Sequence, residues 1–278
     1  MNKKKWLAAL VTILVFNSFT QKKITWVAIG DSITYLNEHL DETSYRLHKG
    51  YLTRVSETLP EVQYINQGHN GWKSTDIAAN IEKLGLVKAD VYSIFLGTND
   101  WWGGIPAGNI NDYKEATGTG TVFGSFRIII DKVRRLNEQA KIILITPMQR
   151  SDFVYVLDHK NNAYGSYKAK NGQLLEDVAN AVITIGKYEH LPVIDLYHDP
   201  RFDIRNMVNF KRLKDPQTSE YKEFPYPQST TIPYNPKTDE YPYPPAAINM
   251  TYDGLHPSDK GDSVIARLIV NTFAKQGL

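Results

Sequence analysis

Gly30, Asp31 and Ser32 directly follow an apolar run, Ile24 to Ile29, near the start of the chain. Such a run predicts a buried strand, and a glycine, an acid and a small hydroxyl after it predict a sharp turn. A serine in this place is either a turn residue or a nucleophile. As a nucleophile Ser32 would need a base within hydrogen-bond reach, because a free serine hydroxyl is almost never ionised at neutral pH.

A candidate base lies near the other end of the chain, in the motif Asp253-Gly-Leu-His256-Pro257. An imidazole has an ordinary pKa of about 6.5, so it can accept a proton from a hydroxyl and later return it to a leaving alcohol. Asp253 is close enough on a turn to hold the other imidazole nitrogen. Pro257 disfavours helical geometry at His256. Taken alone, the motif favours a turn followed by a helix cap, although both interpretations can hold at once; the Gly-Asp-Ser motif upstream reverses that preference.

Two further short motifs combine glycine and asparagine: NQGHNG at residues 66–71 and GTND at residues 97–100. Each stands at the end of a short apolar or β-branched run. Alone, Gly68 and Gly71 predict an ordinary strand-to-helix turn, and Asn99 predicts an Asx turn. Only the joint placement of all four motifs would indicate chemistry.

A sheet could bring these distant motifs together. Short apolar or β-branched runs predict five strands, at Ile24 to Ile29, Val62 to Asn66, Val91 to Leu96, Lys141 to Thr146 and Pro192 to Leu196. The stretches between them predict helices at Tyr51 to Leu59, Ser74 to Leu84, Gly124 to Gln139 and Gln173 to Tyr188. Alternation of strand and helix predicts parallel pairing with helices on both faces, a three-layer α/β/α sandwich.

The last predicted helix has the clearest ends. Ser258 can cap its N-terminus, Asp259 lies in its first turn and Gly277 can end it. Its apolar face is marked by Ile265, Leu268, Ile269 and Phe273. An α/β/α sandwich binds its ligands at the carboxyl ends of the strands, and each motif is expected at such an end or in the loop that follows.

With these four motifs in order and in this strand context, the chain resembles the SGNH hydrolases, the GDSL-type esterase and lipase superfamily. The resemblance covers nearly the whole chain after its first residues. It implies the flavodoxin-like SGNH fold with a five-stranded parallel sheet. It also implies hydrolysis of carboxylic esters through an acyl-serine intermediate, with no cofactor and no metal.

The resemblance implies a role for five residues. Ser32 would be the nucleophile, His256 the base and Asp253 the carboxylate that orients the imidazole. The donors to the oxyanion would be the backbone N–H groups of Ser32 and Gly71 and the side-chain amide of Asn99. Glycine suits this task because a missing Cβ lets the backbone approach a substrate closely.

Neighbouring residues are given weaker roles. We expect Asp31 and Asp100 to be turn and supporting residues without a catalytic duty. Trp101 and Trp102 follow Asn99, so either could stack on a sugar ring or line an acyl pocket, or one of them could pack into the core. Arg150, after the fourth predicted strand, is a weaker candidate for substrate contact, because most arginines in such positions are solvated.

Residues 201–250 break the alternation of strand and helix. The segment is rich in proline, tyrosine and charge and has no helical or strand period. Loops of this length are uncommon in compact domains and tend to be functional. Two interpretations stay open: a polyproline-like excursion that wraps on the surface or on a second subunit of a homo-oligomer, or a substrate-facing insertion.

The first residues have the layout of a secretory signal peptide. Lysines at positions 3–5 precede an apolar run from Trp6 to Phe16 and then small and polar residues. The run is shorter than the roughly 20 residues that cross a bilayer. We therefore predict a signal peptide at residues 1–21, cleaved near Ser18 to Gln21, and one hydrolase domain at residues 22–278. The protein would be periplasmic or secreted by a bacterium, with no stable membrane anchor after cleavage.

Composition narrows the function further. The chain has 278 residues, 42% of them hydrophobic, with a formal charge of +2, which permits a sizeable core and indicates no nucleic-acid partner. The absence of cysteine excludes disulfides, a thiol nucleophile and a lipid-modified cysteine anchor. Seven histidines form no HExxH pair, which gives little support for a metal site.

Three functional hypotheses follow from these observations. The first is an exported esterase that removes acetyl or similar small acyl groups from carbohydrate, with a small-molecule or glycan ester as substrate. The second is a lipase, lysophospholipase or aryl esterase whose aromatic residues line an acyl tunnel. The third is a noncatalytic glycan-binding protein, which a missing triad member or oxyanion donor would indicate; none is missing.

Overall fold

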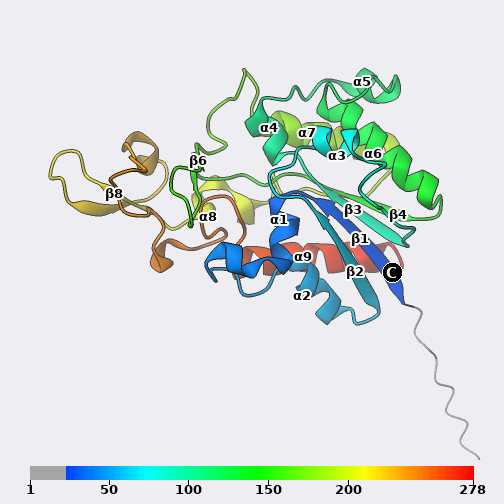
Figure 1. Ribbon diagram of the computed structural model, residues 1–278, viewed down its shortest axis with the longest axis horizontal. Helices are drawn as coiled ribbons and strands as arrows, with labels where there is room; N and C mark the ends of the chain where they lie inside the picture. Colours follow the sequence, from blue (N-terminus) through cyan, green and yellow to red (C-terminus); the bar gives the residue numbers. More distant parts are fainter. Residues whose placement is uncertain (1–22) are drawn as a thin grey trace, which may run out of the picture.

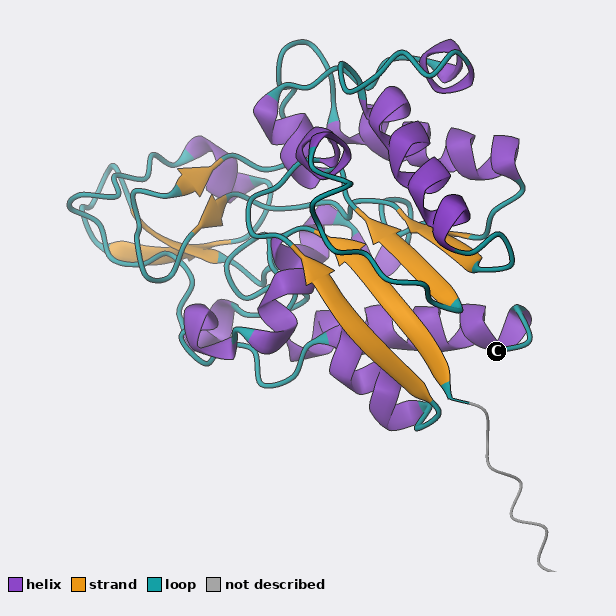
Figure 2. Cartoon of the chain, turned by 45° about the vertical axis from the view of Figure 1, so that its right-hand side comes forward, coloured by secondary structure: helices purple, strands orange, loops and turns teal. Residues whose placement is uncertain are grey.

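The computed structural model describes residues 23–278, and a five-stranded parallel sheet lies at its centre (Figure 2). The strands are β1 (Ile24–Gly30), β2 (Val62–Gly68), β3 (Val91–Phe95), β4 (Lys141–Ile145) and β7 (Val193–Ile194). Their order in the sheet is β2-β1-β3-β4-β7. β1 and β3 are therefore neighbours, and ligands of such sheets bind at the carboxyl ends of the strands where the order reverses. The predicted α/β sandwich with five parallel strands is confirmed.

Helices cover both faces of the sheet (Figure 1). One face carries α3 (Ser74–Ala79), α6 (Val122–Leu136) and α7 (Leu175–Glu189), and the other carries α2 (Tyr51–Thr58) and α9 (Asp259–Lys275). In β1, Val27 and Ile29 pack into the first core, whereas Trp26 and Ala28 pack into the second. Successive side chains of a strand point to opposite faces, so one strand supplies both cores.

Shorter elements complete the described chain. The helices α1 (Ser32–Tyr35) and α4 (Thr98–Gly103) begin just beyond the ends of β1 and β3. The others are α5 (Ile110–Lys114) and α8 (Ile204–Met207). Two short hairpins are formed by β5 (Phe153–Val154) with β6 (Asn162–Ala163), and by β8 (Lys211–Lys214) with β9 (Tyr221–Phe224).

The ends of the predicted elements differ from the observed ones where local hydrogen bonds decide them. α6 begins at Val122 because the hydroxyl of Thr121 accepts the N–H of Gly124 at 3.1 Å. α3 ends at Ala79, well before the predicted Leu84. β7 has only two residues because it pairs with β4 over that length alone. The predicted cap of α9 is present: the hydroxyl of Ser258 accepts a backbone N–H at 3.3 Å.

The predicted signal peptide at residues 1–21 lies outside the described residues. Within residues 23–278, no helix combines the length and the apolar character that crossing a membrane requires.

Residues 201–250, which we call the arm, are more regular than the sequence indicated (Figure 1). The arm contains α8, the β8–β9 hairpin and several short 3-10 turns. The expectation of a segment without strand or helix was wrong. In β8 buried and exposed side chains do alternate, but a strand of four residues is too short for this period to stand out in the sequence.

The arm is held against residues 152–154 of its own chain. Nζ of Lys211 lies 2.7 Å from the Asp152 carboxylate, and both side chains are largely buried. The hydroxyl of Tyr241 donates to the carbonyl of Val154 at 3.1 Å, and that of Tyr243 donates to the carbonyl of Asp152. These contacts attach the arm to the loop that follows β4.

We expect Gly68→Ala to lower the free energy of unfolding by roughly 1–3 kcal/mol, because the new methyl group would overlap backbone. An added Cβ would lie 2.2 Å from the nitrogen of Tyr35 and 2.7 Å from the carbonyl carbon of Thr34, so α1 would have to shift. Denaturant unfolding measures the change. Gly120→Ala is the control: no atom lies within 4 Å of its Cβ position, and it should stay within about 0.5 kcal/mol of the parent. Equal effects of the two substitutions would contradict the packing argument.

Candidate active site

Ser32 lies where β1 gives way to α1. β1 ends at Gly30, and Ser32 is the first residue of α1. Asp31 caps this helix: its Oδ1 accepts the N–H of Ile33 at 3.0 Å. The first N–H groups of a helix have no acceptor within the helix, so the backbone N–H of Ser32 is available beside its hydroxyl.

Ser32, His256 and Asp253 come from opposite ends of the chain and are joined by hydrogen bonds. Nε2 of His256 lies 3.0 Å from Oγ of Ser32, and Nδ1 of His256 lies 2.7 Å from Oδ2 of Asp253. Ser32 is 6% exposed, His256 7% and Asp253 0%. This is the geometry of a nucleophile, its base and the carboxylate that orients the base. The structure therefore brings these three predicted residues together.

The turn at residues 252–256 fixes the carboxylate and the imidazole. Oδ1 of Asp253 accepts the N–H groups of Leu255 at 3.0 Å and His256 at 2.8 Å. The N–H of Tyr252 donates to the carbonyl of His256 at 3.1 Å. The sequence allowed turn and triad to hold at once, and the same hydrogen bonds do form the turn and place the imidazole.

Two aromatic rings flank His256, and sequence reasoning missed both. The ring of Phe153 meets the imidazole edge-on, with centroids 5.4 Å apart and an interplanar angle of 83°. Tyr252 lies nearly parallel to it, with centroids 5.9 Å apart. These rings limit rotation of the imidazole. Tyr252 could have been noticed beside Asp253, whereas nothing in the sequence connects Phe153 with His256.

Gly71 and Asn99 are linked through Trp72. Nδ2 of Asn99 donates to the carbonyl of Trp72 at 3.0 Å, which ties the start of α4 to the loop after β2. An amide nitrogen has two N–H groups, so one remains for another acceptor. Gly71 is exposed and has φ +75°, a conformation that favours glycine. Within residues 23–278 no hydrogen bond joins Ser32 to Gly71 or Asn99; the three are placed near one another by the adjacent ends of β1, β2 and β3.

Asp100 connects α4 to α3. Its carboxylate oxygens lie 3.1 Å and 2.9 Å from the backbone nitrogen of Ser74, and Oδ1 accepts the hydroxyl of Ser74 at 2.7 Å. Asp100 is fully buried, and burial raises the pKa of its carboxyl. These contacts agree with the supporting role predicted for Asp100.

Asp31 is also buried, at 2% exposure. Burial raises the pKa of its carboxyl to about 6, while the N–H of Ile33 and the nearby His256 act in the opposite direction. Asp31 therefore changes charge in the pH range in which an imidazole ordinarily titrates. A measurement of the pH dependence of this site must therefore distinguish the contribution of Asp31 from that of His256.

The two tryptophans after Asn99 have different surroundings. Trp101 is fully buried in the core, whereas Trp102 is half-buried. Packing into the core was one of the two alternatives that the sequence left open, and it holds for Trp101. The partly exposed ring of Trp102 packs edge-on against Tyr164, and Nζ of Lys170 lies 4.6 Å from its centroid.

Arg150 is not the solvated residue that the sequence suggested. It is 2% exposed, and its guanidinium lies 5.4 Å and 5.6 Å from the ring centroids of Trp101 and Trp102. Its Nη2 donates to the carbonyl of Tyr164 at 3.3 Å. Burial lowers the pKa of Arg150 to about 10, so the side chain stays charged at neutral pH. The loop after β4 folds back over this arginine, which its position in the sequence does not reveal.

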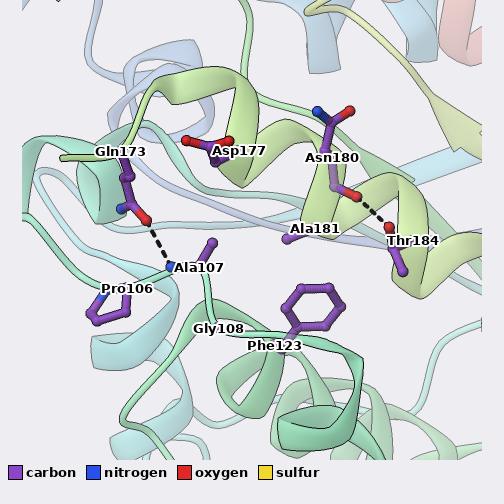
Figure 3. Close-up of a pocket in the computed structure, with 9 residues that line it drawn as sticks. All are labelled: Pro106, Ala107, Gly108, Phe123, Gln173, Asp177, Asn180, Ala181 and Thr184. Carbon is purple, nitrogen blue, oxygen red and sulfur yellow. Dashed lines mark hydrogen bonds between the residues drawn. The ribbon is translucent and has the colours of Figure 1, made fainter. Parts of the chain in front are cut away.

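A separate hollow of about 410 Å³ lies between the start of α6, one side of α7 from Asp177 to Thr184 and residues 106–108 (Figure 3). The side-chain oxygen of Gln173 accepts the N–H of Ala107 at 2.9 Å on one side of it, and Phe123 lines the other. The lining residues include neither a triad member nor a predicted oxyanion donor. We therefore do not assign the chemistry to this hollow.

Comparison with known proteins agrees with this geometry. The GDSL-like Lipase/Acylhydrolase family matches residues 28–264. No curated protein matches the chain. Among solved structures, a possible lipase from Chitinophaga pinensis is 64% identical, with a TM-score of 0.91 over 92% of this chain and 100% of its own.

More distant structures share the fold. An acetyl xylan esterase, AlAXEase, is 20% identical, with a TM-score of 0.52 over 90% of this chain and 99% of its own. A lipase/acylhydrolase from Enterococcus faecalis is 22% identical, with a TM-score of 0.50 over 91% of this chain and 96% of its own. Because the family match spans most of the sequence, and the structure that is 64% identical spans nearly all of it, this chain belongs to the GDSL-like lipase/acylhydrolase family and is a carboxylic ester hydrolase.

Proposed function

We propose that the enzyme hydrolyses esters of small acyl groups, most of all acetyl groups on carbohydrate, with Ser32 as the nucleophile. The observation that carries the mechanism is the continuous hydrogen-bonded path from Ser32 through His256 to Asp253. A serine becomes nucleophilic when a positioned base can take its proton.

In the first half of the reaction, Oγ of Ser32 attacks the ester carbonyl carbon and its proton passes to Nε2 of His256. Asp253 stabilises the imidazolium that forms. The oxyanion is bound by the N–H groups of Ser32 and Gly71 and the amide of Asn99. The tetrahedral intermediate then collapses to an acyl-serine, and Nε2 returns the proton to the leaving alcohol. Water repeats the sequence on the acyl-serine and releases the acid.

The preference for a small acyl group is supported by the low exposure of the nucleophile. Ser32 is 6% exposed, and Trp101 is committed to the core beneath α4. Trp102 stays half-buried at the surface, where an aromatic face can stack on a sugar ring. Export through the leader predicted at residues 1–21 would bring the enzyme to polysaccharide outside the cell. AlAXEase, a protein that shares this fold, is an acetyl xylan esterase.

A lipase is the second candidate, and one observation favours it. The solved structure that is 64% identical is described as a possible lipase. The two candidates differ in the acyl group and in the alcohol, not in the catalytic steps. A complete triad argues against the third hypothesis, a noncatalytic glycan-binding protein.

Ser32→Ala should reduce hydrolysis of p-nitrophenyl acetate by about 10⁴-fold or more in kcat, because no other hydroxyl takes the nucleophile's place. Steady-state kinetics measure the loss, and an unchanged melting temperature shows that the fold is intact. Ser263→Ala is the control: Ser263 lies on the exposed side of α9, and its removal should leave the rate unchanged. Activity that survives Ser32→Ala would exclude the proposed nucleophile.

The value of kcat/KM should fall as the pH is lowered through the acidic range, about tenfold per pH unit at the lower end, because a protonated imidazole cannot accept the proton of Ser32. Asp31, with a pKa of about 6, titrates in the same range. Asp31→Asn keeps an oxygen acceptor for Ile33 and removes that titration. We expect the acidic fall to persist in Asp31→Asn, which assigns it to His256. A flat profile in this variant would assign the fall to Asp31 instead.

Acyl length separates the deacetylase from the lipase. For p-nitrophenyl esters from acetate to octanoate, kcat/KM should decrease by at least about tenfold, because the covered nucleophile admits a small acyl group more readily than a long one. Ester concentrations below micelle formation keep the comparison valid. A rate that rises toward octanoate would favour the lipase.

A further inference from the structure

A second hollow, of about 250 Å³, lies between the β5–β6 hairpin, residues 164–168 and the arm. In Figure 1 these segments lie together beyond the carboxyl ends of the strands, with β6 and β8 neighbouring one another. We call it the arm pocket. Its lining includes Phe153, Tyr164, Tyr167, Lys211, Thr230 and Tyr234.

Two walls of the arm pocket contact catalytic elements. Phe153 lines the pocket and meets the imidazole of His256 edge-on, with centroids 5.4 Å apart. Tyr164 lines it as well and packs against Trp102, with ring centroids 4.8 Å apart and an angle of 72°. Trp102 belongs to α4, the helix that begins beside Asn99. The ring of Phe153 therefore separates the pocket from His256, and the ring of Tyr164 separates it from α4.

One of the two lysines that line the arm pocket, Lys211, is paired with a carboxylate. Nζ of Lys211 lies 2.7 Å from Oδ2 of Asp152, and Oδ1 of Asp152 accepts the hydroxyl of Tyr167 at 2.7 Å and the N–H of Gly165 at 2.8 Å. The pairing with Lys211 helps hold the pKa of Asp152 below its usual value, against the effect of burial. This buried, hydrogen-bonded pair gives the pocket a rigid base, and Lys168 is the remaining charged residue of the lining.

One polar group in the arm pocket lacks a partner. The hydroxyl oxygen of Tyr234 is buried, and no hydrogen bond to it is present among residues 23–278. A buried hydroxyl without a hydrogen bond is costly, so a ligand that bonded to it would gain free energy. Tyr164 and Tyr167 line the same pocket, and Nζ of Lys168 lies 5.5 Å and 5.6 Å from their ring centroids.

We propose that the arm pocket binds one saccharide unit of the ester substrate. This inference rests on the proposed function and makes the arm a substrate-facing insertion. A sugar ring has apolar faces for the tyrosine rings and a hydroxyl for Tyr234, whereas an alkyl chain would leave the Tyr234 hydroxyl unpaired. The hydroxyl of Thr230 already donates to the carbonyl of Pro227 at 2.8 Å. A volume of about 250 Å³ is below the range of roughly 300–1,000 Å³ for drug-sized ligands, which suits a single ring.

Two variants test the arm pocket. Tyr234→Phe removes only the unpartnered hydroxyl, and Thr230→Trp fills the space. On acetylated xylotetraose, Tyr234→Phe should raise KM about 3- to 10-fold with kcat unchanged, the effect of one lost hydrogen bond. Thr230→Trp should lower kcat/KM at least about tenfold. Neither variant should change the kinetics on p-nitrophenyl acetate, which has no sugar. Tyr45→Phe, at a tyrosine that is 73% exposed and outside the pocket lining, should leave both substrates unaffected.

Binding without turnover separates this inference from the proposed function. In the Ser32→Ala background, xylotetraose, mannotetraose and chitotetraose are titrated by calorimetry, with and without Thr230→Trp. Binding of any of them that Thr230→Trp abolishes supports the pocket, even if Ser32 proved not to be the nucleophile. No binding of all three, or equal losses on both ester substrates in the kinetic test, overturns the pocket and leaves the Ser32 mechanism standing.

Discussion

The rest of the structure depends on two hydrogen bonds, one between Ser32 and His256 and one between His256 and Asp253. The fold must bring these three side chains together. The serine and the histidine are 224 residues apart in the sequence, and their side chains must meet at 3.0 Å. Errors of about 1 Å in such placements can cost two orders of magnitude in rate. The fold meets this requirement by packing the last helix against the first strand. Phe273 of α9 contacts Trp26 of β1 edge-on, with centroids 5.3 Å apart, so both ends of the chain share one core.

The strand order explains why the other polar groups gather near the same serine. β1 is flanked by β2 and β3, so the loops after all three strands emerge side by side. The first carries Ser32, the second Gly71 and the third Asn99. The bond from Asn99 to Trp72 and the bonds from Asp100 to Ser74 then tie the second loop to the third. Once the sheet has formed, this part of the site needs only short-range contacts.

The loop after β4 and the arm add what the sheet alone does not supply. Phe153 packs against the imidazole of His256 and limits its rotation. Asp152 anchors the arm through its ion pair with Lys211, and two backbone carbonyls of the loop accept hydrogen bonds from tyrosine hydroxyls of the arm. The same loop covers Arg150 and places Tyr164 against both tryptophans. The sheet thus places Ser32 and the ends of the neighbouring loops, whereas the loop after β4 and the arm pack around His256 and Trp102.

The sequence by itself indicated the fold class, the approximate positions of the strands and the three residues that we propose as the triad. The strands are short apolar runs, and the proposed triad residues lie in short motifs, Ser32 after the first strand and Asp253 and His256 before the last helix, so neighbouring residues encode both. It did not determine that Trp101 would be buried and Trp102 half-exposed, that Arg150 would be covered, that the arm would form a hairpin, or that Phe153 would meet His256. Each of these depends on contacts between segments far apart in the chain, whose free energy no local pattern records. Only the tertiary structure could decide them, because burial is a property of the packed molecule and not of a residue's neighbours in sequence.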